Sequence, residues 1–348
     1  MKKVTIFFLI LGILAIAVGG IGSAVFYQRA KISMVKNQQE AYTIKNKKDI
    51  KELHLTLSGN AAYILRSSTD NQVSMNTQSS VTTPINSSFD AKESKETLTV
   101  SVSGNQKNET FEQFDFQFFH LEDSQIELTI PADIERLVID GDASGTIDVY
   151  DFITTKLEAT IDHADINFIS NTSEEININS RNGYINIYGD SRIEKLSLKS
   201  EYGNTSIYGF TGNEVEIITS SGNIDLNDVK TSKLTADSKN GEFYIIDLRG
   251  DVELTGKSGS IYLAGENLPK KMNAVMEHGD IEIDLPQGVD NITIKAESEL
   301  GDVDLLDEES STYKRGKNGS EFELKTNTGD ISVYDIYYYE EEYEEYEE

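Results

Sequence analysis

The sequence predicts an all-β protein: a β-solenoid of about ten coils of about 19–20 residues each, preceded by one N-terminal transmembrane helix. Two observations predict this architecture. A glycine-punctuated pattern recurs ten times between residues 145 and 333, and an uncharged apolar stretch lies close to the N-terminus. A third observation, the net charge of −29 in 348 residues without cysteine, limits what the protein does.

The first predicted element is a membrane-spanning helix from Val4 to Phe26, 23 residues without a charge. At about 1.5 Å per residue this helix reaches about 35 Å and crosses a hydrocarbon core of about 30 Å. A cleaved signal peptide has a shorter apolar region. We therefore expect residues 1–27 to be an uncleaved signal-anchor that contacts the lipid bilayer, with cleavage near Gly22-Ser23-Ala24 as the alternative.

Residues 28–49 are predicted to form a basic juxtamembrane linker. The first 50 residues carry a net charge of +6, which leaves −35 for residues 51–348. Basic residues flank the predicted span on both sides in nearly equal number, so the positive-inside rule does not fix the orientation. Long downstream domains are translocated largely regardless of flanking charge. We therefore expect the C-terminal domain to be extracellular.

The repeat places apolar residues alternately on both sides of a glycine. With the glycine as position zero, positions +2 and +4 are apolar in 19 of 20 cases, and so are −7 and −5; the exceptions are Thr205 and Asp140. Period-two alternation on both sides of a glycine turn predicts two short strands per repeat, each with one buried face. The repeats are centred on Gly145, Ala164, Gly183, Gly203, Gly222, Gly241, Gly259, Gly279, Gly301 and Gly329, with successive spacings of 19, 19, 20, 19, 19, 18, 20, 22 and 28 residues.

Two architectures satisfy this pattern, a β-solenoid and a meander of hairpins. The near-constant repeat length favours the solenoid, since each coil must stack on the last. The two long spacings then predict loops that project from the side, such as residues 307–319. We expect the solenoid to span residues 131–336, a β-rich N-terminal cap to span 50–130, and an acidic Tyr/Glu tail to follow at 337–348. The phenylalanine-rich segment 111–119 is predicted to be a core or capping strand.

The repeat also resembles a known family. Gly-Asp/Asn-Ile-x-Ile units, separated by Leu-x-Leu-x strands and introduced by Ile130-Pro131, are similar to the bacterial "putative adhesin" domain of unknown function over residues 50–336. Members are often cell-envelope proteins, and some resemble components of Lia-type envelope-stress systems. The resemblance therefore implies a surface-exposed or membrane-tethered role. Its motif is structural and implies no catalytic residue.

The composition excludes several chemistries. Without cysteine there is no disulfide framework, thiolate metal site or cysteine nucleophile. A net charge of −29 argues against nucleic acid as a partner, because phosphate binding needs clustered Lys and Arg. The four histidines, His54, His120, His163 and His278, are scattered and show no hydrolase or metalloprotease spacing. We therefore predict no enzymatic activity, with a carbohydrate-active β-helix enzyme as the alternative.

One candidate metal site stands out. Asp280, Asp302 and Asp330 each follow the glycine of one of the last three repeats. Stacked in register, the three carboxylates would repel one another, and a calcium ion with its preference for oxygen ligands would offset that repulsion. The competing interpretation is that aspartate suits a glycine turn and stays solvated. No other cofactor is predicted.

Together these observations predict a membrane-anchored cell-envelope protein whose extracellular β-repeat domain serves binding, adhesion or envelope-stress sensing. The expected partners are an envelope polymer, a cationic peptide, which the acidic tail would also attract, or a surface protein. An alternative with the same fold is a cytoplasm-facing scaffold of a membrane partner.

Overall fold

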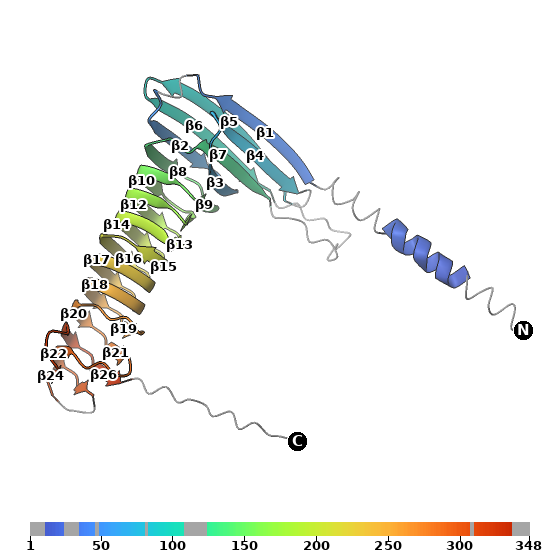
Figure 1. Ribbon diagram of the computed structural model, residues 1–348. Helices are drawn as coiled ribbons and strands as arrows, with labels where there is room; N and C mark the ends of the chain where they lie inside the picture. The colour runs from blue at the N-terminus through green and yellow to red at the C-terminus, as the bar shows by residue number, and fades with distance from the viewer. Residues whose placement is uncertain are drawn as a thin grey trace, which may run out of the picture.

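The computed structural model describes residues 11–23, 35–45, 49–80, 83–107, 124–306 and 310–335. Its strands form an elongated stack, with the N-terminal strands at one end and the C-terminal strands at the other (Figure 1). All 26 described strands belong to one continuous sheet that winds into coils. The predicted all-β, solenoid-like fold is thus confirmed. The phenylalanine-rich segment and the acidic tail lie outside the described residues.

The strands form two ladders, one on each side of the corner glycines. Ladder 1 contains β2 (Glu52–Ser58), β5 (Ile85–Ser94), β6 (Thr97–Gln106), β8 (Arg136–Gly141), β10 (Ile153–Ile161), β12 (Thr172–Asn182), β14 (Ser191–Tyr202), β16 (Glu214–Ser221), β20 (Lys271–His278), β22 (Ile292–Leu300), β24 (Thr312–Arg315) and β25 (Ser320–Thr328). Ladder 2 contains β1 (Val35–Thr43), β3 (Ala62–Ser68), β4 (Gln72–Ser80), β7 (Gln125–Pro131), β9 (Thr146–Tyr150), β11 (Asp165–Ile169), β13 (Ile185–Tyr188), β15 (Thr205–Thr211), β19 (Ile261–Ala264), β21 (Ile281–Leu285), β23 (Val303–Leu305) and β26 (Ile331–Asp335). Two long strands, β17 (Ile224–Asn240) and β18 (Phe243–Ser258), pass from ladder 2 into ladder 1.

The core is a set of apolar columns inside the stack. In the coil of β12 and β13, for example, Ile176, Ile178, Ile185 and Ile187 are fully buried, and the residues between them are more exposed. Parallel pairing sets Ile176 beside Leu196 of the next coil. Equivalent side chains therefore pack about 4.8 Å apart along the column. Each buried side chain of this size contributes about 1.5–3 kcal/mol through the hydrophobic effect.

The structure explains both exceptions to the repeat. Asp140 faces outward because Leu137 and Ile139 are the residues of β8 that pair with the inward Leu157 and Ala159, so the turn to Gly145 is one residue longer. Thr205 does face inward, where its side chain is buried and its hydroxyl has no hydrogen-bond partner. The exception at Asp140 is therefore caused by a shift in register, whereas Thr205 is a polar residue within an apolar column.

The order of the coils in space differs from their order in the chain at both ends. The β2–β3 coil lies between the β6–β7 and β8–β9 coils. At the other end, the β25–β26 coil lies between the β20–β21 and β22–β23 coils. Stacking in chain order, as expected from the sequence, is therefore wrong at the ends. Residues 50–130 contribute two coils of the stack together with antiparallel strands β4 and β5, and β24 pairs antiparallel with β22 within the stretch expected to be a loop.

Residues 11–23 form a helix. Its large apolar side chains are exposed; Ile16, for example, is 77% exposed. Among the described residues, no helix has both the length and the hydropathy needed to cross a membrane. The remainder of the predicted Val4 to Phe26 span lies outside the described residues.

Candidate binding surfaces

A hydrogen bond between neighbouring coils explains why aspartate or asparagine follows the corner residue in several repeats. The Asp165 side chain accepts a hydrogen bond from the backbone N–H of Tyr184 in the next coil, at 2.8 Å between Oδ1 and N. Asn204 and Asn223 each accept the corresponding bond at 2.9 and 3.0 Å. A short side-chain acceptor at this position thus satisfies a backbone donor that the turn leaves free.

Asp280, Asp302 and Asp330 belong to the same row, in a different order from the chain. Asp280 Oδ1 accepts the Asp330 N–H at 2.8 Å, and Asp330 Oδ1 accepts the Asp302 N–H at 2.9 Å. The row therefore runs Asp280, Asp330, Asp302. Asp280 and Asp330 thus satisfy backbone donors at the glycine turns, which agrees with the interpretation that aspartate suits such a turn.

Calcium binding at this row stays a prediction. Nowhere in the described ranges do three His, Asp or Glu side chains form a group suited to hold a metal ion. Titration of calcium into the full chain tests the prediction. A rise in melting temperature that Asp330→Asn abolishes would support it, whereas an unchanged melting temperature and no heat of binding would remove it.

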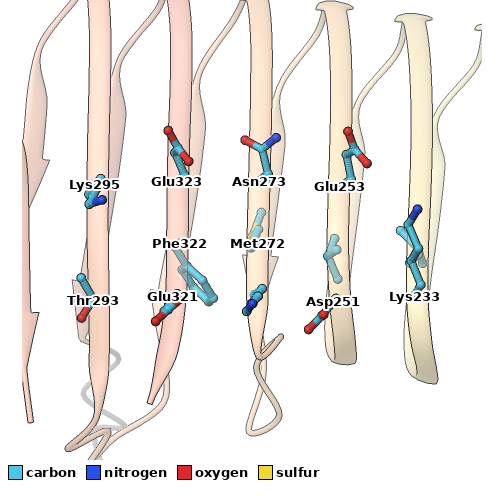
Figure 2. A pocket seen from close by; sticks show the side chains of 13 residues that line it. Lys233, Asp251, Glu253, Met272, Asn273, Thr293, Lys295, Glu321, Phe322 and Glu323 are labelled. Atoms are coloured by element: carbon cyan, nitrogen blue, oxygen red, sulfur yellow. The ribbon is translucent and has the colours of Figure 1, made fainter. Parts of the chain in front are cut away.

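The outer side of ladder 1 carries alternating charges. Register pairing sets Glu175 beside Lys195, Lys195 beside Glu214, and Glu214 beside Lys233. The alternation continues through Asp251, Lys271 and Glu321. Figure 2 shows Lys233, Asp251, Glu321 and Thr293 along the lower edge of this surface, with Glu321 and Glu323 on the strand next to that of Thr293 and Lys295. The inserted β25 thus preserves the alternation, because it brings Glu321 rather than Thr293 next to Lys271.

At the N-terminal end of this surface the charges form ion pairs. Arg136 on β8 contacts Glu52 at 2.7 Å and also Glu158, and Lys156 contacts Glu158 and Glu175 at 3.1 and 3.0 Å. Burial favours the neutral form of Glu158, but hydrogen bonds from Arg136 and Lys156 outweigh it and lower the pKa of this carboxyl. The network joins four adjacent strands, and as partly exposed pairs its members contribute little individually.

The outer side of ladder 2 carries tyrosines, amides and acids. Tyr188 and Tyr208 stack with ring centroids 5.5 Å apart, and Tyr244 and Tyr262 stack at 5.2 Å. An amide row accompanies them, since Asn186 donates to Asn167 at 2.8 Å. The Tyr262 hydroxyl donates to Asp284 at 2.7 Å, and this bond to a carboxylate raises the pKa of Tyr262. This surface was not predicted from the sequence, although tyrosines recur at odd positions after the glycine and therefore lie on the outward face of the strand.

The histidines within the described residues do not form a catalytic arrangement. His54 Nε2 lies 2.6 Å from Asp140 Oδ2, but both side chains are more than one-third exposed. His278 Nδ1 lies 2.8 Å from the Thr328 hydroxyl on the adjacent strand β25. Both contacts join neighbouring coils on the outer surface of ladder 1. This is the geometry of cross-strand surface pairs, and His163, the third described histidine, is exposed.

Comparison with known proteins identifies the family. Residues 50–334 match the model of the Toastrack family, DUF4097, and the chain therefore belongs to that family. The resemblance stated from the repeat motif is confirmed. No curated protein sequence matches the chain.

Solved structures of similar proteins include three from Parabacteroides and Bacteroides species. A "putative lipid binding protein" from Parabacteroides distasonis has 14% identity and a TM-score of 0.41, over 87% of this chain and 97% of that one. A "putative adhesin" from Parabacteroides merdae has 11% identity and a TM-score of 0.39 over the same shares. Another from Bacteroides fragilis has 11% identity and a TM-score of 0.35, over 86% of this chain and 97% of that one.

Proposed function

We propose that this Toastrack-family chain is a membrane-anchored, non-catalytic binding module, displayed outside the cell membrane for adhesion or for sensing stress in the envelope. The observation that carries the proposal is the repetition of outward side chains on two long, rigid ladders. Each ladder offers the same row positions about every 4.8 Å along the stack. Such a surface suits weak, repeated contacts with an extended partner. Once one contact has formed, the next one forms at a high effective concentration, and the overall affinity rises.

The proposed anchor is the Val4 to Phe26 stretch. The helix at 11–23 supports it, since its leucine, isoleucine and valine side chains are exposed rather than packed against the strands. An uncharged helix with all its large apolar side chains exposed is unfavourable in water and favourable in lipid. The strongly acidic body would be repelled by anionic lipid headgroups, which suits a domain held away from the membrane surface.

The non-catalytic part of the proposal rests on the shape and chemistry of the ladders. Their outer residues are held on extended strands, and several charged residues of ladder 1 pair with their neighbours across the strands. Groups arranged in this way stabilise the sheet rather than converge on a reacting atom.

Protease treatment of intact cells tests the topology. With an epitope at the C-terminus, we expect added protease to remove the epitope from intact cells and the protein to stay in the membrane fraction after alkaline washing. A chain without residues 4–26 is the control and should leave the membrane fraction. Loss of the epitope only after lysis would instead support a cytoplasm-facing scaffold. New reducing ends in envelope polysaccharide incubated with the purified chain would overturn the non-catalytic assignment.

A further inference from the structure

On the outer side of ladder 2, Tyr244 has a stacked ring on one side alone. Tyr244 on β18 stacks on Tyr262 of β19 at 5.2 Å, and on its other side its register partner on β17 is Asp225. Tyr244 is 51% exposed. The Tyr244 ring is therefore half exposed and has Asp225 rather than a second ring on its β17 side.

Asp225 is a carboxylate without a cation. It is partly buried, and none of the ion pairs among the described residues includes it. Burial raises its pKa, and nearby Glu242 acts in the same direction, whereas a hydrogen bond with Ser206 opposes them. A cation placed over this carboxylate would offset the cost of its burial.

Two residues further along β17, Asn227 lies on the same outer face as Asp225. Its register partner on the other side is Tyr208 of β15, which stacks on Tyr188 and is 39% exposed. Tyr208 and Tyr244 thus border β17 on opposite sides and are offset along the strand, because Tyr208 pairs with Asn227 and Tyr244 with Asp225. The two rings therefore flank the outer face of β17 at Asp225 and Asn227.

The chain itself shows how a guanidinium occupies such a position. Arg66 on β3 is the register partner of Tyr150 on β9, and its guanidinium carbon lies 4.4 Å from the centroid of the Tyr150 ring. The same guanidinium contacts the carboxylate of Glu127 at 3.2 Å. A ring on one side and a carboxylate beside it therefore hold an arginine on this outer face, at the N-terminal end of ladder 2.

The charge of the surface matches such a ligand. From β9 to β26, the ladder 2 strands contain no Lys or Arg except Lys230 of β17 and Arg249 of β18. Acidic side chains accompany the tyrosines along these strands, and the whole chain carries a net charge of −29. Such a field attracts basic segments and raises their rate of association at low salt.

We propose that the slot formed by Tyr208, Asp225 and Tyr244 binds an arginine side chain from an extended, basic segment of a partner protein. The proposal rests on the function proposed above, and names the partner chemistry of one of its surfaces. The guanidinium donates to Asp225 and lies against the Tyr244 ring, as Arg66 lies against Tyr150. An arginine suits this slot better than a lysine, since its planar group stacks and donates at once.

A peptide titration tests the proposal. The full chain, purified in a non-ionic detergent, is titrated at low salt with a peptide of alternating arginine and glycine, and with a matched lysine peptide. Tyrosine fluorescence reports binding, because the chain has no tryptophan. We expect the arginine peptide to bind more tightly, Asp225→Asn to weaken it about tenfold through loss of a charge-assisted contact, and Tyr244→Leu to weaken it about threefold.

Two variants on ladder 1 are the matched controls. Glu253→Gln removes an exposed charge and Tyr202→Leu an exposed ring, and neither should change the affinity. The proposal falls if the peptide does not bind, if the lysine peptide binds equally well, or if the control variants weaken binding as much as the slot variants. Failure here leaves the topology measured by protease treatment unaffected, so the two proposals fail separately.

Discussion

The corner glycines are the residues on which the stacking of the coils depends most directly. Gly222 has a φ of +149°, and a Cβ on it would overlap the carbonyl oxygen of Gly203, the corner glycine one coil earlier. Its own N–H donates to the Asn240 carbonyl at 3.0 Å. A side chain at this position therefore forces two coils apart where their backbones are bonded.

We predict that Gly222→Ala lowers the free energy of unfolding by about 2–4 kcal/mol, through strain and overpacking together. Thermal and urea unfolding followed by circular dichroism measure this. Gly288→Ala is the control, since Gly288 has a φ of +82° and no atom within 4 Å of the added Cβ. It should cost about 1 kcal/mol from the backbone conformation alone. Equal losses in the two variants would contradict the close approach of the corners.

A second residue-scale prediction concerns pH. The raised pKa of Asp225 means that the folded state holds this proton at a higher pH than the unfolded chain does. Stability from this group is therefore present at low pH and is lost as the pH rises through the folded-state pKa. We expect Asp225→Asn to raise the melting temperature at pH 7 by about 2 °C and to change it little near pH 3.

The control for Asp225 is Glu282→Gln, which removes an exposed acid from the same ladder. It should leave the melting temperature unchanged at both pH values, because a solvated carboxylate gains nothing from neutralisation beyond a small reduction in net charge. A lower melting temperature for Asp225→Asn at pH 7 would show that the charged form stabilises the fold.

At the scale of strands, alternating charges favour the observed neighbours. Lys271 on β20 lies between Asp251 of β18 and Glu321 of β25. Opposite charges across adjacent strands each contribute about 0.2–1 kcal/mol, and like charges destabilise by a similar amount. The alternation therefore favours β25 over β22 as the strand beside β20.

We predict that Lys271→Glu lowers the free energy of unfolding by about 1–2 kcal/mol, since it creates two like-charge neighbours. Adding Glu321→Lys restores one favourable pair and should recover part of the loss. A double-mutant cycle from urea unfolding at low salt measures the coupling, expected at about 0.5–1 kcal/mol and reduced by added salt. Strictly additive effects of the two substitutions on the free energy of unfolding would show that Lys271 and Glu321 do not interact.

The sequence predicts most of the coil and less of the surface. Inward positions such as Ile176 and Ile185 were identifiable because burial follows the two-residue period of a strand. The position of β25 between β20 and β22 was not identifiable, because pairing between coils is non-local and the spacing of the repeats does not encode it. The charge alternation and the slot at Asp225 appear only once the register is known, because their members come from different repeats.

At the scale of the whole molecule, the last two described strands, β25 and β26, lie within the stack of coils rather than at its end. A chain ending at residue 318 lacks the coil that joins β20–β21 to β22–β23. We predict that its melting curve broadens and that trypsin cleaves it within residues 292–317, because β22 and β24 lose their attachment to the stack. A chain ending at residue 335 retains every described strand and should match the full chain in both assays. Equal stability of the two truncated chains would contradict the interior position.

This arrangement has a consequence during synthesis. The ribosome releases β22, β23 and β24 before the two strands that separate them from the rest of the stack. The coil of β25 and β26 can therefore take its place between β20–β21 and β22–β23 only after both neighbouring coils have been synthesised. A prematurely terminated chain is left with an unfilled gap rather than with a shorter, finished column. Quality-control proteases that recognise unpaired strands would thus distinguish it from a chain that includes β25 and β26.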